Sequence, residues 1–218
     1  VERGAVVAPY VVTAVRSTAW SRTISGSGDV FAVRLRPAGL AVLSTIDAAS
    51  LTGEQEMTPP MDHRAHHFLR QIEAEPDVAT RAQKADALVR ALVDEHPLHS
   101  SQRLANAAVD AIVSHPARQK GNELALSLGV SVRTLQRALS SHVGRGPGEI
   151  ARRVRLQEVV RRLSVEQNDI ARIAIELGYV DQAHLTNDFR RVANMTPGAY
   201  IAALARSQTA LDSGSSSA

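Results

Sequence analysis

Apolar positions follow a helical period in the second half of the chain, and the same pattern occurs twice. From residue 124 it reads Leu-Ala-x-x-Leu-Gly-Val, then Leu135 and Leu139, then Gly-Pro-Gly-Glu-Ile. From residue 173 it returns as Ile-Ala-x-x-Leu-Gly-Tyr, then Leu185 and Phe189, then Thr-Pro-Gly-Ala-Tyr. The offset between the copies is 49 residues up to the glycine and 50 beyond it. The second copy therefore carries one extra residue in its turn.

Each copy predicts a helix, a tight turn that starts at a glycine, and a second helix with one apolar face. Ala125 and Ala174 lie one turn before the glycine, where a larger side chain would push the two helices apart. Gly129 and Gly178 supply the left-handed conformation that such a turn commonly needs. One such turn is weak evidence, because many helical bundles contain one. Two copies in register, each followed by a Pro-Gly pair that is predicted to stop the second helix, predict a double helix-turn-helix.

The first half of the chain changes from strand-like to helical periodicity. Residues 10–16 and 30–36 predict half-buried strands, with Phe31, Val33 and Leu35 on one face, and a Ser-Gly turn lies between them. Beyond two prolines the period is helical, and helices are predicted over residues 63–74, 79–95 and 102–114. Leu88 and Leu92 form an apolar stripe, for which packing within the chain is favoured over a dimer surface.

Composition limits the class of protein. With 218 residues and 44% apolar content, the chain can form one or two domains with packed cores. An aromatic content of 3% argues against a large β-sandwich or barrel. No apolar run is long enough to span a membrane and no leader is evident, so we expect a soluble, cytoplasmic protein. The absence of cysteine excludes disulfide scaffolds, thiolate metal sites and thiol nucleophiles.

Basic residues concentrate where the repeat lies. Residues 1–100 hold 10 Lys and Arg against 12 Asp and Glu, whereas residues 101–206 hold 15 against 9. A solvated basic face would be the simpler interpretation of this excess taken alone. Because the arginines coincide with the motif helices, a polyanionic partner is favoured.

Two helix-turn-helix copies joined by one long helix resemble the DNA-binding domain of the AraC/XylS family of bacterial transcription regulators. The likeness covers residues 102–204 and is carried by Leu124, Ala125, Leu128 to Ser131 and Arg133 to Arg137 in the first motif, and by Ile173, Ala174, Leu177 to Tyr179, Asp181 to Leu185, Phe189, Arg190, Thr196 and Pro197 in the second. Leu139 replaces an aromatic residue that is frequent in the family, and Asn194 replaces a glycine. Neither change abolishes the fold, since Leu fills an apolar slot and Asn tolerates the left-handed conformation.

The expected fold is mainly α, in four segments. Residues 1–60 are expected to form a small β-rich (cupin-like) sensing domain, because residues 30–39 look like part of that domain in a subgroup of the family. The stretch before them is short, so an incomplete domain is expected. A helical connector over residues 61–100 follows, with its boundary in the polar segment 95–101. The double helix-turn-helix domain then covers residues 101–206, and a Ser-rich tail over 207–218 is predicted to be disordered.

The resemblance implies a transcription regulator, activator or repressor, whose partner is double-stranded DNA. RNA polymerase, a small-molecule effector and a second copy of the chain are further partners that it suggests. No membrane partner and no cofactor are expected. The sequence contains no nucleophile–base constellation, phosphate-binding glycine loop or acid pair, so an enzyme is not expected either.

The start of each second helix contains the residues that reach base edges when a helix lies in the major groove. Ser131 and Asp181 are predicted to cap these helices, which run to about residues 141 and 192. The DNA-binding candidates are Arg133, Thr134, Gln136 and Arg137 in the first motif, and Gln182, His184, Thr186, Asn187 and Arg190 in the second, with Thr186 and Arg190 as backbone contacts. Because the first set is more strongly charged, we expect it to contribute more sequence discrimination.

A helix over residues 148–163 is predicted to join the two motifs as a rigid spacer that keeps their separation fixed. Its arginines Arg152, Arg153 and Arg155 have two interpretations that the sequence leaves open. They contact DNA phosphates, or they brace the linker helix.

Three histidines suggest an alternative chemistry. His63 and His67 are spaced to share a helix face, and His66 and Asp62 lie beside them. Surface histidines near a domain junction are commoner than metal sites, so no metal site is predicted. The alternative function is a ligand- or metal-binding module with a vestigial DNA-binding domain. Loss of the groove-facing polar residues would favour it, yet the sequence retains them.

Overall fold

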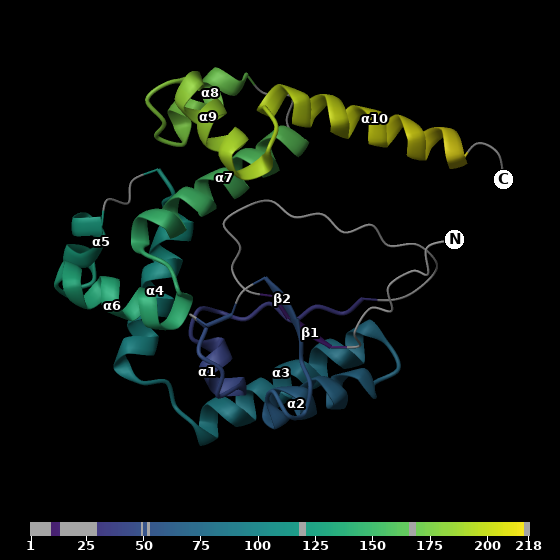
Figure 1. Cartoon of the computed structure of the whole chain (residues 1–218), viewed down its shortest axis with the longest axis vertical. Coiled ribbons are helices and arrows are strands. Elements are labelled where there is room, and N and C mark those ends of the chain that lie inside the picture. Colours follow the sequence, from purple (N-terminus) through teal and green to yellow (C-terminus); the bar gives the residue numbers. More distant parts are fainter. Residues whose placement is uncertain are drawn as a thin grey trace. The chain divides into compact units, whose positions relative to one another are not determined.

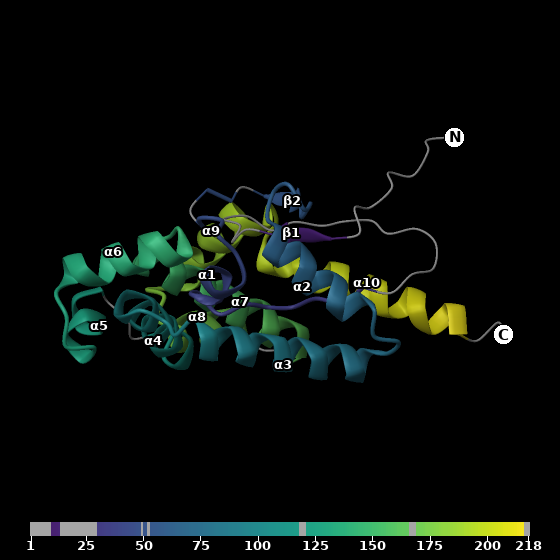
Figure 2. The ribbon, with the colours of Figure 1, turned by 90° about the horizontal axis from the view of Figure 1, so that it is seen from below.

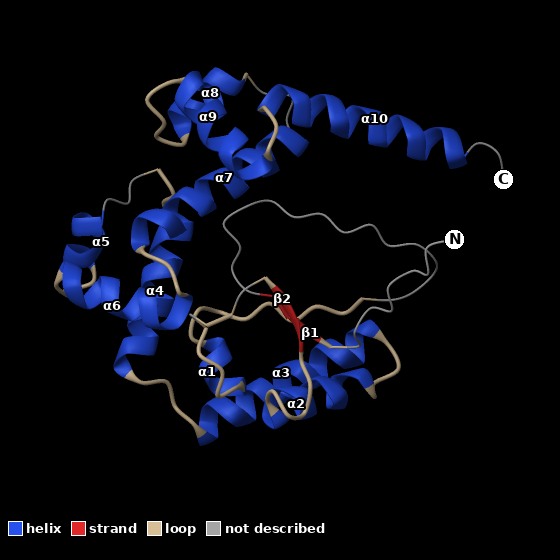
Figure 3. Cartoon of the chain, viewed as in Figure 1, coloured by secondary structure: helices blue, strands red, loops and turns tan. Residues whose placement is uncertain are grey.

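The computed structural model describes residues 10–13, 30–48, 50–51, 53–117, 121–165 and 169–215, with residues 207–215 described by their backbone alone. The chain divides into two compact units (Figure 1). The described part of the first comprises the N-terminal elements through residue 111 together with residues 121–147. That of the second comprises residues 112–117 and everything from residue 148. Helices make up most of the regular structure (Figure 3).

Twelve elements follow one another in the described residues. The N-terminal elements are β1 (Val11–Thr13), α1 (Gly39–Leu43), β2 (Glu54–Glu56), α2 (His63–Glu73) and α3 (Val78–Glu95). The first predicted motif corresponds to α4 (Ser100–Ser114), α5 (Gly121–Ser127) and α6 (Val132–Val143). The second corresponds to α7 (Pro147–Val165), α8 (Ile170–Glu176), α9 (Gln182–Ala193) and α10 (Pro197–Ser215).

The N-terminal strands differ from the prediction. β1 pairs in antiparallel orientation with β2, and Val12 lies opposite Gln55. Residues 30–36 form no strand, although Phe31, Val33 and Leu35 are half-buried and alternate with exposed residues as expected. These three side chains pack against the helical core of the first unit instead of joining a ladder. Residues 14–29, which include the predicted turn, lie outside the described residues.

The described part of residues 1–60 contains one two-stranded sheet and the short helix α1. It does not confirm the predicted β-rich, cupin-like domain. The partner of β1 is the polar segment Glu-Gln-Glu, which no hydrophobic alternation marks in the sequence. The sequence pattern therefore could not identify β2.

Helices α2 and α3 lie side by side (Figure 1, Figure 2). They enclose a core of Leu43, Phe68, Ile72 and Ala85. The apolar stripe of α3, formed by residues 88, 89 and 92, packs against this core. The interpretation of the stripe as packing within the chain is confirmed.

The segment at residues 95–101 does not separate two domains, because contacts cross it. Arg36 forms an ion pair with Asp110 of α4. The backbone N–H of Ala38 donates to Oδ1 of Asn106 at 3.0 Å. These bonds hold most of α4 to the N-terminal residues, so the division into two units differs from the predicted limits at residues 60 and 100.

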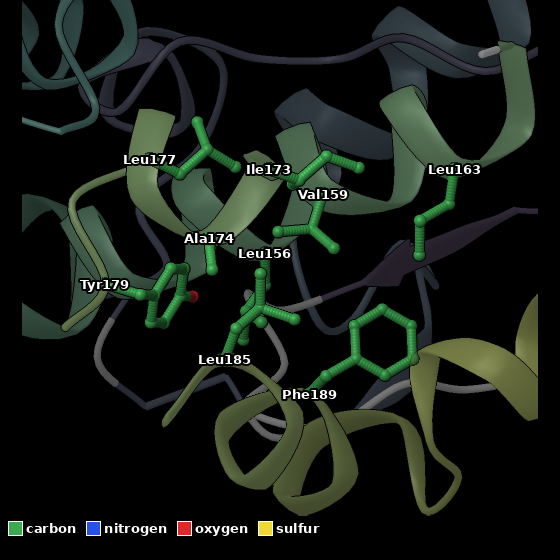
Figure 4. Packing of buried hydrophobic residues seen from close by; sticks show 9 residues of the cluster. All are labelled: Leu156, Val159, Leu163, Ile173, Ala174, Leu177, Tyr179, Leu185 and Phe189. Atoms are coloured by element: carbon green, nitrogen blue, oxygen red, sulfur yellow. The ribbon is translucent and has the colours of Figure 1, made fainter. Parts of the chain in front are cut away.

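The core of the second unit is formed by three helices that converge on one cluster (Figure 4). Its members are Leu156, Val159 and Leu163 of α7, Ile173, Ala174 and Leu177 at α8, Tyr179 in the turn, and Leu185 and Phe189 of α9. The alternation of three- and four-residue spacings places these side chains on one face of each helix.

Helix α10 continues to Ser215, where the sequence predicted a disordered tail from residue 207. Alanine and leucine are frequent from residue 199 to residue 211, and both have high helix propensity. The serines at the end suggested disorder, but the helix extends through their first members. No helix in the described part of the chain is long and apolar enough to cross a membrane.

Candidate nucleic-acid interface

Both predicted turns are present, and both have the expected backbone. Gly129 has a φ of 66° and Gly178 a φ of 75°, in the left-handed region. The N–H that follows each glycine returns to the carbonyl of the alanine one turn earlier, at 3.0 Å in the first motif and 2.9 Å in the second. Ala125 and Ala174 are buried at 2% and 0% exposure, so neither position has room for a larger side chain. Each copy of the repeat therefore contains a helix, a left-handed glycine turn and a second helix.

The second helix of each motif begins at the predicted cap. Ser131 accepts a hydrogen bond from the N–H of Thr134 at 3.1 Å, and Asp181 accepts one from the N–H of His184 at 2.7 Å. One residue separates glycine and cap in the first motif, and two separate them in the second. The extra residue therefore lies in the second turn, as the offset predicted. At their C-termini, α6 and α9 end on left-handed Gly144 and Asn194, with φ values of 71° and 56°.

The two Pro-Gly pairs have a different role from the predicted one. Pro147 and Pro197 are the first residues of α7 and α10. Proline suits the first helical position, because its fixed φ fits a helix and its missing N–H would have no partner within the helix anyway. Each pair therefore begins a helix, and the preceding left-handed residue ends the helix before it.

In the first motif, α6 has one buried and one exposed face. Leu135 and Leu139 are fully buried. Arg133, Gln136 and Arg137 are exposed. Thr134 is half-buried, and its Oγ1 lies 2.8 Å from Oγ of Ser131, so this hydroxyl supports the cap.

In the second motif, α9 divides in the same way. Its exposed side chains are Gln182, His184, Asn187 and Arg190, and Thr186 is half-buried. The ring of His184 lies edge-on to the buried ring of Tyr179, with centroids 5.3 Å apart. All the candidate residues of both motifs except the two threonines are therefore exposed on a helix whose opposite face forms the core.

Helix α7, the predicted linker, holds arginines that contact protein. Nε of Arg152 donates to Oδ1 of Asp188 at 2.7 Å, and the guanidinium of Arg155 lies 5.3 Å from the centroid of the Tyr179 ring. For these two side chains the geometry favours bracing over phosphate contact. Asp188, which is 7% exposed, was not among the sequence candidates. An acidic residue between Leu185 and Phe189 on the apolar face was the signal that could have identified it.

Burial raises the pKa of Tyr179 far above its ordinary value, and the negative charge of Asp188 adds to the effect. The phenol therefore stays protonated, and it donates to Oδ2 of Asp188 at 3.3 Å.

A second set of charges joins α7 to α8. Both carboxylate oxygens of Glu158 accept from Arg161, at 2.8 and 2.7 Å, and one also accepts from Arg162 at 2.9 Å. Arg162 bonds in turn to Glu176, which also accepts from Arg172 at 2.8 Å. The hydrogen bonds from Arg161 are the largest cause that lowers the pKa of Glu158, to about 2.

Replacing Glu158 with Gln should lower the free energy of unfolding by roughly 1 kcal/mol at pH 7 and low salt, a small value because the pairs are partly solvated. A carboxylate whose pKa falls on folding stabilises the chain above its ordinary pKa of 4.5. That contribution is lost as the pH falls towards 2. Urea titrations of both proteins from pH 7 to pH 2 measure the difference. A difference that stays constant over this range would contradict the assignment.

The histidines of α2 form two separate ring contacts. The rings of His63 and His67 stack at 6.1 Å, while His66 lies against the ring of Tyr10. Asp62 is buried and caps α2, and it accepts hydrogen bonds from Ala65, Ser44 and Thr45. Burial raises its pKa, but these hydrogen bonds together lower it below the ordinary value. In the ranges that the structure describes, no three metal-ligating side chains come together.

Comparison with known proteins agrees with this geometry. The helix-turn-helix domain family matches residues 124–203, which include both turns. A protein of Streptomyces antibioticus described as an AraC-like transcription regulator is 37% identical over 78 residues, or 36% of this chain and 26% of that protein. Residues 124–203 therefore form a helix-turn-helix domain of the AraC/XylS type.

Two further relatives are named as HTH-type transcriptional regulators. The HTH-type transcriptional activator RhaS of Pectobacterium atrosepticum is 35% identical over 74 residues, covering 34% of this chain and 26% of RhaS. An uncharacterized HTH-type regulator of Haemophilus influenzae is 28% identical over 52% of this chain and 39% of its own. The chain thus spans between a quarter and two fifths of the length of these relatives.

Among solved structures, an AraC-type regulator from Chromobacterium violaceum overlaps 47% of this chain and 92% of its own, with 24% identity and a TM-score of 0.45. The DNA-binding domain of AdpA, solved with a target DNA, overlaps 46% of this chain and 90% of its own, with 26% identity and a TM-score of 0.43.

Proposed function

We propose that this chain is a sequence-specific transcription regulator that binds duplex DNA through both helix-turn-helix motifs. The observation that carries the proposal is the exposed polar face at the start of α6 and α9, each held by a buried apolar face and a side-chain cap. The relatives are named as transcriptional regulators, which supports the same assignment.

In this proposal, α6 and α9 enter adjacent segments of the major groove. Arg133 and Arg137 can each form a bidentate pair with guanine, and Gln136 or Gln182 with adenine. His184 and Asn187 complete the second set, while Thr186 and Arg190 contact the backbone. The continuous helix α7 acts as the spacer between the motifs. The chain would act in the cytoplasm, and an effector, RNA polymerase and a second copy remain further proposed partners.

Selection of bound fragments from a genomic library tests the proposal. The full chain is incubated with sheared genomic DNA, and the recovered fragments are sequenced and then titrated by mobility shift at several salt concentrations. We expect a recurrent site that binds at least tenfold more tightly than random DNA of equal length. Binding that depends on salt but is equal for all fragments would overturn the proposal, since it would reflect only phosphate attraction.

On a selected site, Arg137→Ala should cost more affinity than Asn187→Ala. A charged bidentate pair with guanine is stronger than a neutral amide contact, and the loss at Arg137 should be roughly 2 to 3 kcal/mol. Titration of wild type and both variants on one labelled duplex measures the ranking. Arg206→Ala, which changes an exposed arginine of α10 outside α6 and α9, is the control for lost charge alone. A greater loss of affinity for Asn187→Ala would show that the second motif contributes more sequence discrimination than the first.

A further inference from the structure

Four side chains meet at the buried face of α9, and they come from three different elements. Arg152 and Arg155 belong to α7, Tyr179 to the turn, and Asp188 to α9. Asp188 accepts from Arg152 on one oxygen and from Tyr179 on the other. Tyr179 is 5% exposed and lies against the guanidinium of Arg155.

Hydrogen bonds fix orientation in a way that the surrounding apolar core does not. Packing of Leu185 and Phe189 is favourable for any close fit, whereas a hydrogen bond weakens steeply when its angle changes. Because the donors to Asp188 lie on α7 and in the turn, α9 cannot rotate about its axis without breaking at least one of these bonds.

The network is an expensive way to stabilise a core. Within the described residues, the buried Nη2 of Arg152 and Nε of Arg155 have no hydrogen-bond acceptor. Unpaired buried donors cost free energy, and apolar side chains of similar volume are often more stable than buried ion pairs. Stability alone therefore does not account for these four residues.

Among the described residues of the first copy, the equivalent positions hold no charged side chains. When α4 is aligned with α7 by buried positions, residues 105, 108 and 112 match residues 156, 159 and 163. The places of Arg155, Tyr179 and Asp188 are then taken by the apolar Leu104, Val130 and Ala138. The place of Arg152 is taken by Ser101, whose Oγ lies 3.1 Å from Nε2 of His142 on α6 in an exposed contact. The motif that carries the charged candidates Arg133 and Arg137 is held by apolar packing and by this one exposed contact, with no buried charge among the aligned positions. The second motif, whose candidate base contacts are mostly amides and a histidine, has the hydrogen-bond network in addition to its apolar core.

That asymmetry has a physical reason. A charged guanidinium on a long side chain still attracts its target after a small displacement, whereas a neutral amide or imidazole needs its partner at hydrogen-bond distance. Binding residues must be held within about 0.5 Å of their productive position by supporting contacts. Asp188 directly follows Asn187, and Tyr179 contacts the ring of His184. The network therefore adjoins two of the candidate base contacts of α9.

We propose that Arg152, Tyr179 and Asp188 are positioning residues that set the orientation of α9 for base reading. The inference rests on the proposed function and names the residues on which the second motif depends. They touch no DNA themselves. Their effect is selective for the base pairs read by α9.

The test measures base discrimination along the selected site. Binding of the full chain is determined for every single-base variant of that site, for wild type and for Asp188→Asn. We expect discrimination at the base pairs read by α9 to fall roughly tenfold, while discrimination at those read by α6 is unchanged. Tyr179→Phe, which removes one hydroxyl, should give a smaller loss at the same base pairs and keeps the test valid if Asp188→Asn unfolds.

Two further proteins separate positioning from stability. Glu176→Gln weakens an exposed ion pair in the same unit and should leave the discrimination profile unchanged. Arg152→Gln combined with Asp188→Asn should cost less than the sum of the single changes, because the two residues act through one bond. A uniform loss of affinity over all base variants in Asp188→Asn and Tyr179→Phe would overturn the inference.

Failure of the inference and failure of the proposed function are distinguishable. If the wild-type chain shows no preferred site, the proposed function is wrong. If the wild type prefers a site and Asp188→Asn keeps the full discrimination profile, only the positioning role is wrong.

Discussion

Phe189→Ala should lower the free energy of unfolding of the second unit by about 3 to 4 kcal/mol. The ring is 2% exposed and belongs to the largest buried side chains of the described residues. It points from α9 into the cluster formed with α7 and α8 (Figure 4). Its ring centroid lies 5.8 Å from that of Tyr200. Truncation removes transfer free energy and leaves a cavity that three helices cannot close.

Thermal and urea denaturation followed by circular dichroism measure this loss. Ile175→Ala is the matched control, since Ile175 is apolar, lies on α8 in the same unit and is 71% exposed. We expect the control to change the free energy of unfolding by less than about 0.5 kcal/mol. Equal effects of the two changes would mean that the cluster around Phe189 is not the core of this unit.

The sequence predicted this core because the helices are amphipathic and because the pattern occurs twice. Each copy supports the reading of the other, so the turn, the caps and the buried face were all predictable from residue spacing. The same argument fails for the N-terminal half. Phe31, Val33 and Leu35 alternate like a strand, and alternation only requires one buried face. Alternation does not require a hydrogen-bonded neighbouring strand. Here β1 pairs with β2 and not with residues 30–36.

The exposed faces of α6 and α9 were predicted from their position after the caps, and the structure places the candidate side chains there. Their contact with DNA stays a prediction. The support beneath α9 was not predicted. The role of the buried Asp188 follows from its hydrogen bonds with Arg152 and Tyr179, which only the fold brings close. These partners lie 36 and 9 residues away in the sequence. Residue spacing predicts which side chains share one face of a helix. It does not predict which side chains from different elements come into contact.

The turn of the second motif should tolerate a methyl group less well than that of the first. Both Gly129 and Gly178 have positive φ values, so alanine at either position is strained by about 1 to 2 kcal/mol. They differ in what surrounds them. A Cβ on Gly129 would meet nothing within 4 Å, whereas one on Gly178 would lie 2.9 Å from the backbone oxygen of Ala117.

Gly178→Ala should therefore destabilise the chain by about 3 kcal/mol, and Gly129→Ala by about half as much, because a backbone carbonyl cannot move aside as the end of a flexible side chain can. Chemical denaturation of the two variants beside wild type gives the comparison, and each serves as the control for the other. Similar losses would show that backbone strain alone decides both positions. A larger loss at Gly129 would contradict the close approach of Ala117 to the second turn.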